Sequence, residues 1–550
     1  MNRTSDTRHC GRIFWMLLIL NLVSNSLVLW QYPSLFGVLC VVCLSGLFAT
    51  AETLAVHLLG RVWKPLGTAA LWIMTALYTL LTATDIFMIT TFGQVIFYHT
   101  AELIMNTRAD EGATFGKSYF GPLTIALYAG GAAAYIYAAW MLARLADAHI
   151  GARWGRRIAI GTSVAGTAIY LYMGVAAVCS AGTNGGYIPA YTTLTRVLNS
   201  LRHSTQTLRF TRELTAACRE AEATAVTTPE TDFVFILGES FACHHTPLYG
   251  YDRPTTPNLS AWSADSSLVV FTDVISPSDN TLNAMKYMLN MSVVDRGTSS
   301  TPIFPVLFRR AGYYTALYEN QFTTGDGDYF QSAPELSGIC YDFRSDRYLA
   351  DDSIVAAAIR PVGRPGFYFI HLYGQHYYYR DRYPASFARF TPDGYDSRRF
   401  TPTQRADLAA YDNATLYNDH IVASIIGKWR DRDAVVVYIS DHGEEIHDLS
   451  DFFGHGTAKG ASDPSFQLRV PMMVYMTPTF LHRHPEKALA IRRAAPLRAT
   501  TDDIGHMLME LADISTPSFD PARSVVNPAY DPTRPRLIRI SYEPHPQVYD

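Results

Sequence analysis

The stretch Asp232-Phe-Val-Phe-Ile-Leu-Gly-Glu239-Ser240 decides the fold of the second half of this chain. It is a short apolar run that ends abruptly at a carboxylate. The same construction recurs at Ala434-Val-Val-Val-Tyr-Ile-Ser-Asp441-His442-Gly443, and a third version is Phe367-Tyr-Phe-Ile-His-Leu-Tyr-Gly-Gln-His376. Continuous apolar runs rich in Val, Ile and Phe are typical of strands that are buried on both faces, as in a parallel sheet. The sequence therefore predicts an α/β domain with a mostly parallel central sheet.

Metal-binding side chains follow each of these three predicted strands. Glu239 ends the first strand, Asp441 and His442 end the second, and His376 comes shortly after the third. In open α/β sheets the functional site lies outside the carboxyl ends of the strands. We therefore expect these four side chains at one edge of the sheet. Oxygen and imidazole ligands gathered there indicate a metal site, and zinc is the ion that suits them best.

Thr281 is the candidate nucleophile. It follows Ser276-Pro-Ser-Asp-Asn280 and opens a predicted helix. The sequence leaves two interpretations of this position open. In the first, the hydroxyl caps the helix, because Thr is a good N-cap. In the second, it attacks a substrate: free N–H groups at a helix N-terminus stabilise phosphate, and a neighbouring zinc ion favours the alkoxide.

His376 and His455 lie in less specific contexts. A lone histidine is more often structural than catalytic, but each of these follows a strand or lies near Asp441 in a turn-like stretch. Both are candidates for holding phosphate oxygens, binding a second metal ion or protonating a leaving group. The alternation of side chains along the third strand predicts that His371 instead points into the packing of the sheet.

The first third of the chain is mostly apolar. Its hydrophobic stretches approach the roughly 20 residues that are needed to cross a bilayer. We predict a transmembrane domain over residues 1–181, with five spans at Ile13–Trp30, Leu35–Ala55, Ala69–Phe92, Pro122–Leu145 and Ile158–Cys179. Glu52 and Asp85 lie within or near these spans, where buried charge is costly, so they either support the bundle or line a path for a headgroup.

The distribution of cations orients this domain. The N-terminus and the connections after the second and fourth spans are rich in Lys and Arg, whereas the connections after the first and third spans are not. Cations concentrate on the cytoplasmic side of a membrane. The N-terminus is therefore predicted to be cytoplasmic, and five spans place everything after Cys179 outside.

The remainder of the chain divides in two. Residues 182–230 are predicted to be a connector whose helical spacing fits a linker helix or a helix on the membrane surface. Residues 231–550 alternate strands and helices, and Val269–Ile275 is predicted to be one strand. External cysteines allow one or two disulfides, but the sequence does not assign their partners. The formal net charge of −4 and the lack of a basic aromatic stripe give no indication of a nucleic-acid partner.

Taken in order, these residues resemble the phosphoethanolamine transferases of Gram-negative envelopes, a family within the alkaline phosphatase and sulfatase superfamily. The segments that carry the resemblance are Gly238-Glu239-Ser240, Leu248-Tyr-Gly-Tyr-Asp-Arg-Pro-Thr-Thr-Pro-Asn-Leu259, Thr281, His371-Leu-Tyr-Gly-Gln-His376, Ser440-Asp-His-Gly-Glu444, His455-Gly456, Val470-Pro471 and Thr500-Thr-Asp-Asp-Ile-Gly-His506. Five spans before the catalytic domain match the family as well. The second of these segments is more similar to the branch that acts on the lipopolysaccharide core than to the lipid A branch.

The resemblance implies a fold and a set of site residues. The outer domain would have the alkaline-phosphatase-like fold. Glu239, Thr281, Asp441 and His442 would bind one tightly held zinc ion, with Thr281 as the nucleophile and a second zinc ion as a further option. His376 and His455 would contact the phosphoryl group or a second metal ion. The residues expected near the donor headgroup are Thr107, Glu111 and Asn320.

The resemblance also implies the partners and the location. The donor would be phosphatidylethanolamine, and the acceptor would be a lipopolysaccharide or lipooligosaccharide, modified on its core or its lipid A. The protein would be a monomer surrounded by membrane lipids. It would span the bacterial inner membrane several times, with a cytoplasmic N-terminus and a periplasmic catalytic domain.

Four other functions compete with this interpretation. A phosphoglycerol transferase or a membrane-tethered phosphodiesterase could share the fold and the ligands. A sulfatase needs Cys or Ser in a Cys/Ser-x-Pro-x-Arg motif, and no such motif occupies the Thr281 position. A non-catalytic scaffold would be expected to have lost ligands, yet Glu239, Thr281, Asp441 and His442 are all present.

Overall fold

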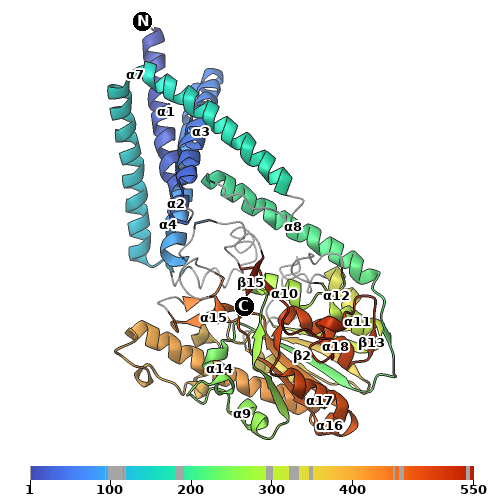
Figure 1. Cartoon of the computed structure of the whole chain (residues 1–550). Coiled ribbons are helices and arrows are strands. Elements are labelled where there is room, and N and C mark those ends of the chain that lie inside the picture. Colours follow the sequence, from blue (N-terminus) through green and yellow to red (C-terminus); the bar gives the residue numbers. More distant parts are fainter. Residues whose placement is uncertain are drawn as a thin grey trace. The chain divides into compact units, whose positions relative to one another are not determined.

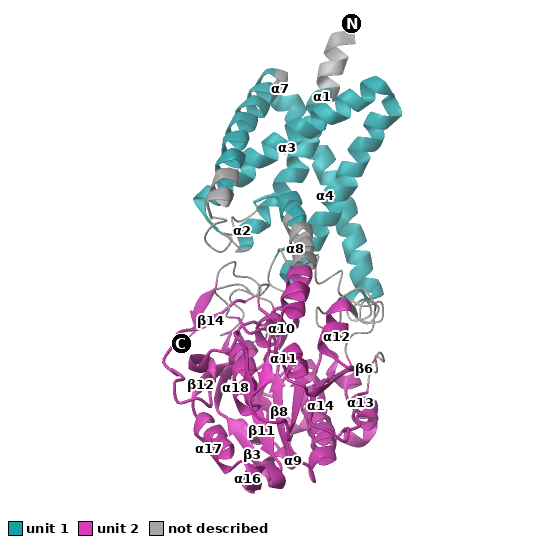
Figure 2. Ribbon diagram, turned by 90° about the vertical axis from the view of Figure 1, so that its right-hand side faces the viewer, with its two compact units in different colours: residues 1–207, 457–459 teal, residues 208–456, 460–550 magenta. Residues whose placement is uncertain are grey.

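The computed structural model describes residues 2–31, 33–92, 95–96, 116, 119–180, 191–292, 301–320, 334–345, 351–449, 453–456, 464–540 and 546–549. These residues form two compact units, one reaching to residue 207 and the other comprising most of residues 208–550 (Figure 2). The boundary falls within α8 (Thr193–Arg219). This helix lies inside the stretch 182–230 that was predicted to be a helical connector.

The first unit is helical (Figure 1). Its elements are α1 (Asn2–Ser26), α2 (Val28–Gln31), α3 (Leu35–Val62), α4 (Lys64–Phe92), α7 (Pro122–Ser180) and the first part of α8. Among the described residues, four stretches are long and apolar enough to cross a membrane, namely Cys10–Trp30, Leu35–Val62, Lys64–Thr91 and Pro122–Ile150. The predicted fifth span, Ile158–Cys179, lies in the second half of the continuous helix α7. The four long apolar helices are therefore present, and the fifth span stays a prediction.

Two acidic side chains of this unit, the partly buried Glu52 and the buried Asp85, have polar partners. Glu52 accepts hydrogen bonds from Asn21 Nδ2, at 2.9 Å, and from the Tyr78 hydroxyl. Asp85 accepts a hydrogen bond from the backbone N–H of Ile96, at 2.8 Å, and forms an ion pair with Arg196. The side chains of Asp85 and Arg196 are 0% and 1% exposed, respectively. Both acids therefore hold helices of this unit together.

The second unit is built on a seven-stranded sheet. In spatial order its strands are β3 (Leu268–Phe271), β11 (Met472–Met476), β8 (Ala434–Ser440), β2 (Asp232–Gly238), β7 (Gly366–His371), β5 (Tyr314–Glu319) and β6 (Phe343–Ser345). The pairs from β8 to β6 are all parallel, and β11 runs antiparallel to both of its neighbours. The predicted α/β domain with a mostly parallel sheet is confirmed.

Helices cover both faces of this sheet. Because side chains alternate along a strand, Phe233, Phe235 and Leu237 of β2 pack with α10, α11 and α18 on one face. Val234 and Ile236 pack with α14 on the other face. The helices of this unit are α9 (Pro257–Ala264), α10 (Thr281–Met288), α11 (Phe304–Arg310), α12 (Pro334–Cys340), α13 (Asp352–Ala358), α14 (Pro402–Ile426), α15 (Ser465–Leu468), α16 (Pro478–Arg483), α17 (Pro485–Ala494) and α18 (Ile504–Leu511).

Short strands pair outside the main sheet. They are β1 (Thr224–Ala225), β4 (Asp273–Ile275), β9 (Glu445–Ile446), β10 (Phe453–Gly454), β12 (Arg498–Thr500), β13 (Ile514–Ser515), β14 (Arg536–Ile538) and β15 (Gln547–Tyr549). The prediction of one strand over Val269–Ile275 is wrong, because β3 and β4 are separate strands in different sheets. The backbone N–H of Thr272 donates to Ala495, outside the main ladder, and β4 then pairs with β12. This break redirects the chain toward α10.

The cysteines of the second unit are buried thiols. Cys218, Cys243 and Cys340 are free, as are Cys10, Cys40 and Cys43 of the first unit. The side chains of Cys218 and Cys340 form a hydrogen bond with each other. The one or two disulfides that the sequence allowed are therefore not formed among the cysteines whose side chains the structure describes.

The Arg196–Asp85 pair gives a test of the first unit. Removing one member of a buried ion pair leaves an uncompensated charge, which costs about 3–5 kcal/mol. We expect Arg196→Ala to lower the thermal unfolding midpoint of the full chain in detergent markedly. Arg12→Ala is the control, because the Arg12–Asp147 pair is more exposed and such pairs contribute about 0–1 kcal/mol. Similar small shifts in both variants would contradict the assigned role.

Candidate metal centre

The in-register pairing of β2 with β8 places two carboxylates side by side. Gly238 is the partner of Ser440 in this parallel ladder, so the next residues, Glu239 and Asp441, leave the same edge of the sheet together. Ser240 has a φ of 51°, in the left-handed region that side chains rarely adopt. Its backbone N–H donates to Asp441 Oδ1 at 3.2 Å. The turn after β2 is therefore tied directly to the second carboxylate.

Thr281 lies at the first position of α10, and the helix is capped by the residue before it. The Asn280 side chain accepts the backbone N–H of Asn283 at 3.1 Å. This leaves the Thr281 hydroxyl available for another role. Its Oγ1 lies 3.2 Å from Glu239 Oε2 and 3.2 Å from His442 Nε2. The structure thus favours the second of the two interpretations that the sequence left open.

His442 directs its Nε2 toward this group. Its Nδ1 donates to the carbonyl of Gly443 at 2.7 Å, so the tautomer that fits has a lone pair on Nε2. This Nε2 lies 3.2 Å from Asp441 Oδ2 and 4.0 Å from Glu239 Oε2. Asp441 Oδ2 is buried and receives no hydrogen bond.

Glu239, Asp441 and His442 therefore direct lone pairs at one another, while the Thr281 hydroxyl donates to Glu239. Ligand atoms of Glu239, Asp441 and His442 all lie within 4.8 Å of one another, and Thr281 Oγ1 joins them. Such a set is repulsive unless a proton or a cation lies between its members. Oxygen and imidazole ligands in a buried group of four suit Zn²⁺. The residues present therefore fit a zinc ion.

The pKa shifts of the two carboxyl groups agree with a site that a cation would stabilise. Burial raises the pKa of Glu239 to about 7, and the neighbouring Asp441 carboxylate adds to the effect. Burial also opposes ionisation of Asp441, but His442 and a hydrogen bond from Thr281 outweigh it and lower the pKa of Asp441. Asp441 is thus the more acidic of the two groups, and Glu239 keeps its proton below a pH of about 7 unless a cation displaces it.

Gly443 is required by the turn that carries His442. A Cβ atom at this position would lie 2.3 Å from the carbonyl oxygen of Phe466, which is too close. The Gly443 N–H donates to the carbonyl of Gln467 at 2.8 Å. The segment around α15 therefore packs directly on the backbone of the metal-binding turn.

Sequence reasoning missed a buried chain of carboxylate, imidazole and carboxylate behind the site. His371 Nε2 lies 3.3 Å from Glu239 Oε1, and His371 Nδ1 lies 2.8 Å from Glu319 Oε1. All three side chains are 0% exposed. The expectation that His371 points into the sheet packing is right about its burial but overlooks its contact with Glu239. Glu319 is the last residue of β5 and Glu239 directly follows β2, so a carboxylate at the end of an apolar strand was the available signal.

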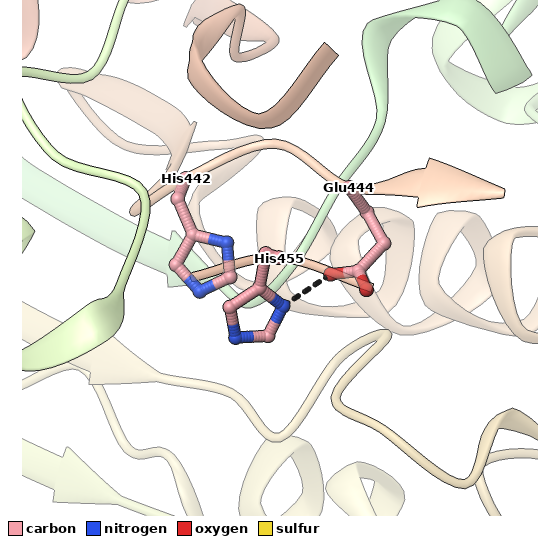
Figure 3. Close-up of side chains that lie close together, drawn as sticks. All are labelled: His442, Glu444 and His455. Atoms are coloured by element: carbon pink, nitrogen blue, oxygen red, sulfur yellow. Dashed lines mark hydrogen bonds and ion pairs between the residues drawn. The ribbon is translucent and has the colours of Figure 1, made fainter. Parts of the chain in front are cut away.

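His455 lies against the metal-binding histidine (Figure 3). The ring centroids of His442 and His455 are 3.9 Å apart, and His455 Nδ1 donates to Glu444 Oε2 at 2.7 Å. Burial alone would lower the pKa of His455, but the Glu444 carboxylate reverses the effect and raises it. Tyr379 donates to the other oxygen of Glu444 at 2.9 Å. We assigned no role to Glu444 from the sequence, although it directly follows the Asp441-His442-Gly443 turn.

Ligand atoms of His442, Glu444 and His455 form a second group that is compact enough for a metal ion. One imidazole cannot offer the same nitrogen to two ions, and His442 Nδ1 already donates to Gly443. In this arrangement the group is better described as a histidine held by a carboxylate than as a second metal site.

His376 lies in a turn that Asp352 organises. The Asp352 carboxylate accepts the backbone N–H groups of Tyr373 and Gly374, both at 2.8 Å. Burial lowers the pKa of His376 to about 3, and the charges of Arg382 and His455 add to the effect. Asp441 and His442 also act on His376, as the predicted common edge requires. His376 is thus a neutral imidazole.

Of the residues predicted to lie near a donor headgroup, the structure describes Asn320 alone. Asn320 is 0% exposed and donates to the Asp352 carboxylate. Thr107 and Glu111 lie outside the described residues. Their proposed roles remain predictions.

A buried cluster of oxygen and imidazole ligands at the carboxyl ends of parallel strands, beside a helix-borne hydroxyl, defines a metal-dependent enzyme class with an alkaline-phosphatase-like fold. A comparison with protein families agrees with this class. The sulfatase family model matches residues 231–514, and the chain belongs to that family.

Curated relatives confirm the resemblance to phosphoethanolamine transferases. The chain is 31% identical over 283 residues to the Kdo(2)-lipid A phosphoethanolamine 7''-transferase of Escherichia coli strain K12, a match covering 48% of this chain and 47% of that protein. It is 27% identical over 318 residues to phosphoethanolamine transferase EptC of E. coli O18:K1:H7, covering 54% of each. The chain thus spans about half the length of the curated relatives it matches.

Solved structures share the fold. The C-terminal periplasmic domain of EptC from E. coli matches with a TM-score of 0.53 and 25% identity, covering 59% of this chain and 93% of that domain. That domain has also been solved in complex with Zn. The integral membrane lipooligosaccharide phosphoethanolamine transferase A of Neisseria meningitidis matches with a TM-score of 0.59 and 16% identity, covering 93% of this chain and 97% of that one. The last match shows that the fold extends over both units.

Zinc affinity should depend on pH through Glu239. In the metal-free protein this carboxyl has a pKa of about 7, so below that pH it is protonated and zinc must displace the proton. We expect the zinc affinity to fall as the pH is lowered through 7, by about tenfold per pH unit from this group alone. Competition with a zinc-binding dye between pH 5.5 and 8.5 measures it. An affinity that is flat across this range would contradict the assignment of Glu239 as a ligand.

Glu319 and His371 should act as positioning residues for Glu239. Loss of such an outer partner typically weakens metal binding about 10–100-fold. We expect this loss in Glu319→Gln and in His371→Gln, with the fold retained by circular dichroism. Glu335→Gln is the matched control, because the Glu335 carboxylate is exposed and pairs with Arg219. Wild-type zinc affinity in both buried variants would show that Glu319 and His371 do not position Glu239 for zinc binding.

Proposed function

We propose that the protein transfers phosphoethanolamine from phosphatidylethanolamine to a lipopolysaccharide or lipooligosaccharide acceptor. Thr281 carries the phosphoryl group between the two reactions. One observation carries the proposal: the Thr281 hydroxyl is free of helix capping and lies 3.2 Å from both Glu239 and His442. The names of the curated relatives indicate the transferred group, phosphoethanolamine, and the class of acceptor.

Glu239, Thr281, Asp441 and His442 would hold one zinc ion. The bound ion would lower the pKa of the Thr281 hydroxyl and neutralise charge on the phosphoryl oxygens. The Zn complex of the related E. coli domain supports this choice of metal. His442 keeps its Nδ1 on Gly443, so its Nε2 remains directed at the ion throughout.

In the first step, Thr281 Oγ1 attacks the phosphorus of the donor. The bond between phosphorus and the glycerol oxygen breaks, and diacylglycerol leaves with a proton. Thr281 then bears phosphoethanolamine. In the second step, an acceptor oxygen attacks the same phosphorus, its proton departs, and the Thr281 hydroxyl is regenerated. The N-terminus of α10 faces the charge that develops at this position.

The two outer histidines have different tasks. Glu444 raises the pKa of His455 and so favours its protonated form, which can give its Nε2 proton to the leaving glycerol oxygen. His376, with a pKa of about 3, stays neutral and can only donate a hydrogen bond to a phosphoryl oxygen. The structure therefore supports His455 as the general acid.

The helical unit would hold the lipid donor in the bilayer. We propose five spans, with Ile158–Cys179 as the fifth, a cytoplasmic N-terminus and a periplasmic catalytic domain in the inner membrane of a bacterium. The membrane domain then comprises residues 1–181, the connector residues 182–230 and the catalytic domain residues 231–550. The full-length match to an integral membrane protein supports the arrangement. Holding a lipid beside the site lowers the entropic part of the barrier.

The covalent intermediate is directly testable. We expect intact-mass analysis of the zinc-loaded full chain, incubated with phosphatidylethanolamine and no acceptor, to show one phosphoethanolamine adduct on Thr281. Thr281→Ala should show no adduct, and Thr281→Ser should retain part of it because a hydroxyl remains. An adduct in Thr281→Ala would exclude this residue as the nucleophile. A phosphoglycerol adduct from phosphatidylglycerol, with none from phosphatidylethanolamine, would assign the competing transferase activity.

The charge of Glu444 should set the alkaline limb of the pH–rate profile. His455 donates a proton, so activity is lost as the pH rises through its pKa. Glu444→Gln removes the charge that raises this pKa, so the limb should move to lower pH, measured as kcat/KM for diacylglycerol release. Tyr379→Phe is the control, because it removes only a neutral hydrogen-bond donor to Glu444. An unmoved limb in Glu444→Gln would exclude His455 as the general acid.

A further inference from the structure

A cavity of about 540 Å³ in the second unit is lined by arginines. Its lining residues are Asp273, Arg469, Arg498, Arg536 and Tyr549. Two small sheets build it. Arg498 of β12 is the register partner of Asp273 in β4, and Arg536 of β14 is the register partner of Tyr549 in β15. The backbone pairing therefore brings these four residues together as two fixed pairs.

The lining has an excess of positive charge. Three guanidinium groups and one carboxylate line the cavity, counted over the residues that the structure describes. Arg536 is 5% exposed, pairs with Asp273 at 2.6 Å and lies over the Tyr549 ring at 5.5 Å. Its Nε is buried without a hydrogen-bond partner. A buried donor of this kind is costly unless a ligand or water accepts from it.

Phosphate is the ligand chemistry that fits. A guanidinium offers a planar fork of donors that matches phosphate oxygens in pairs. The three arginines and one aspartate of the described lining give a net charge of +2, which balances the −2 charge of a phosphate monoester dianion. Arg469 is fixed in turn by its bond to the carbonyl of Thr272, at 3.3 Å.

Two of the segments that line the cavity continue toward the metal centre. β4, which carries Asp273, leads through the loop 276–280 into Thr281. Arg469 follows Leu468, whose carbonyl accepts the Ser276 N–H at 2.7 Å. An anion held in the cavity would thus rest on the two segments that also bear the nucleophile and support the metal-binding turn.

We propose that this cavity binds a phosphate group of the acceptor glycolipid and thereby orients the acceptor for the second step. The assignment rests on the proposed transfer to a lipopolysaccharide-type acceptor. It adds the chemical class of the acceptor group, a phosphate monoester, and the side chains that recognise it, Arg469, Arg498 and Arg536.

A binding experiment on the full chain in detergent tests the proposal without depending on turnover. The ligands are a lipooligosaccharide and the same preparation dephosphorylated with hydrogen fluoride. The variant is Arg469→Gln with Arg498→Gln, two half-buried positions, which leaves the buried Arg536–Asp273 pair intact. We expect the variant to bind the phosphorylated ligand about tenfold more weakly or worse, because charge-assisted hydrogen bonds are lost. It should bind the dephosphorylated ligand as the wild type does.

Two controls separate the outcomes. Arg398→Gln removes an exposed arginine paired with Asp396 and should change neither affinity. The wild type and the double variant should form the Thr281 adduct from the donor to the same extent, because the acceptor takes no part in that step. Absence of the adduct in the wild type would refute the proposed transferase activity, and the binding result for the cavity would still stand. Equal loss of affinity for both ligands would overturn phosphate recognition. Binding of inorganic phosphate that is lost in the variant, with lipooligosaccharide affinity unchanged, would make the cavity a free-phosphate site and overturn the acceptor role.

Discussion

The in-register parallel pairing of β2 with β8 is the constraint on which the rest of the site depends. Because Gly238 pairs with Ser440, two carboxylates leave the sheet at the same height and meet in a buried position. Two adjacent anions in such a place are unfavourable without a cation. The paired strands therefore place uncompensated negative charge at this edge of the sheet, and the surrounding residues keep the ligand atoms directed at that point. His442 keeps its Nε2 lone pair inward, and Ser240 adopts a left-handed backbone to reach Asp441.

Residues that are not predicted ligands hold these groups in place. His371 contacts one oxygen of Glu239 and is itself held by Glu319, and Asn280 caps α10 so that the Thr281 hydroxyl is not needed as a cap. None of these residues would need to touch a substrate. Their shared effect is to fix the direction of a lone pair before any ion or phosphoryl group arrives. Preorganisation of this kind reduces the reorganisation that the reaction itself requires.

The sequence predicted the parts of the site that follow from local pattern and one topological rule. Strands β2, β7 and β8 are continuous apolar runs, and ligands at their carboxyl ends must meet at one edge. It could not choose between cap and nucleophile for Thr281, because both explanations use the same helix N-terminus and differ only in what Asn280 does. Glu319 was missed because its contact with His371 depends on the pairing of β5 with β7, which local pattern does not reveal. The arginine cavity rests on strands of three residues, which are too short to show periodicity.

The break between β3 and β4 connects these observations. One continuous strand over Val269–Ile275 would have kept Asp273 within the main sheet. Instead the chain leaves that sheet at Thr272, pairs with β12 and delivers Thr281 to the carboxylates. The same excursion sets Asp273 opposite Arg498 and forms one wall of the cavity. A single interruption of the ladder thus places both the nucleophile and one wall of the arginine cavity.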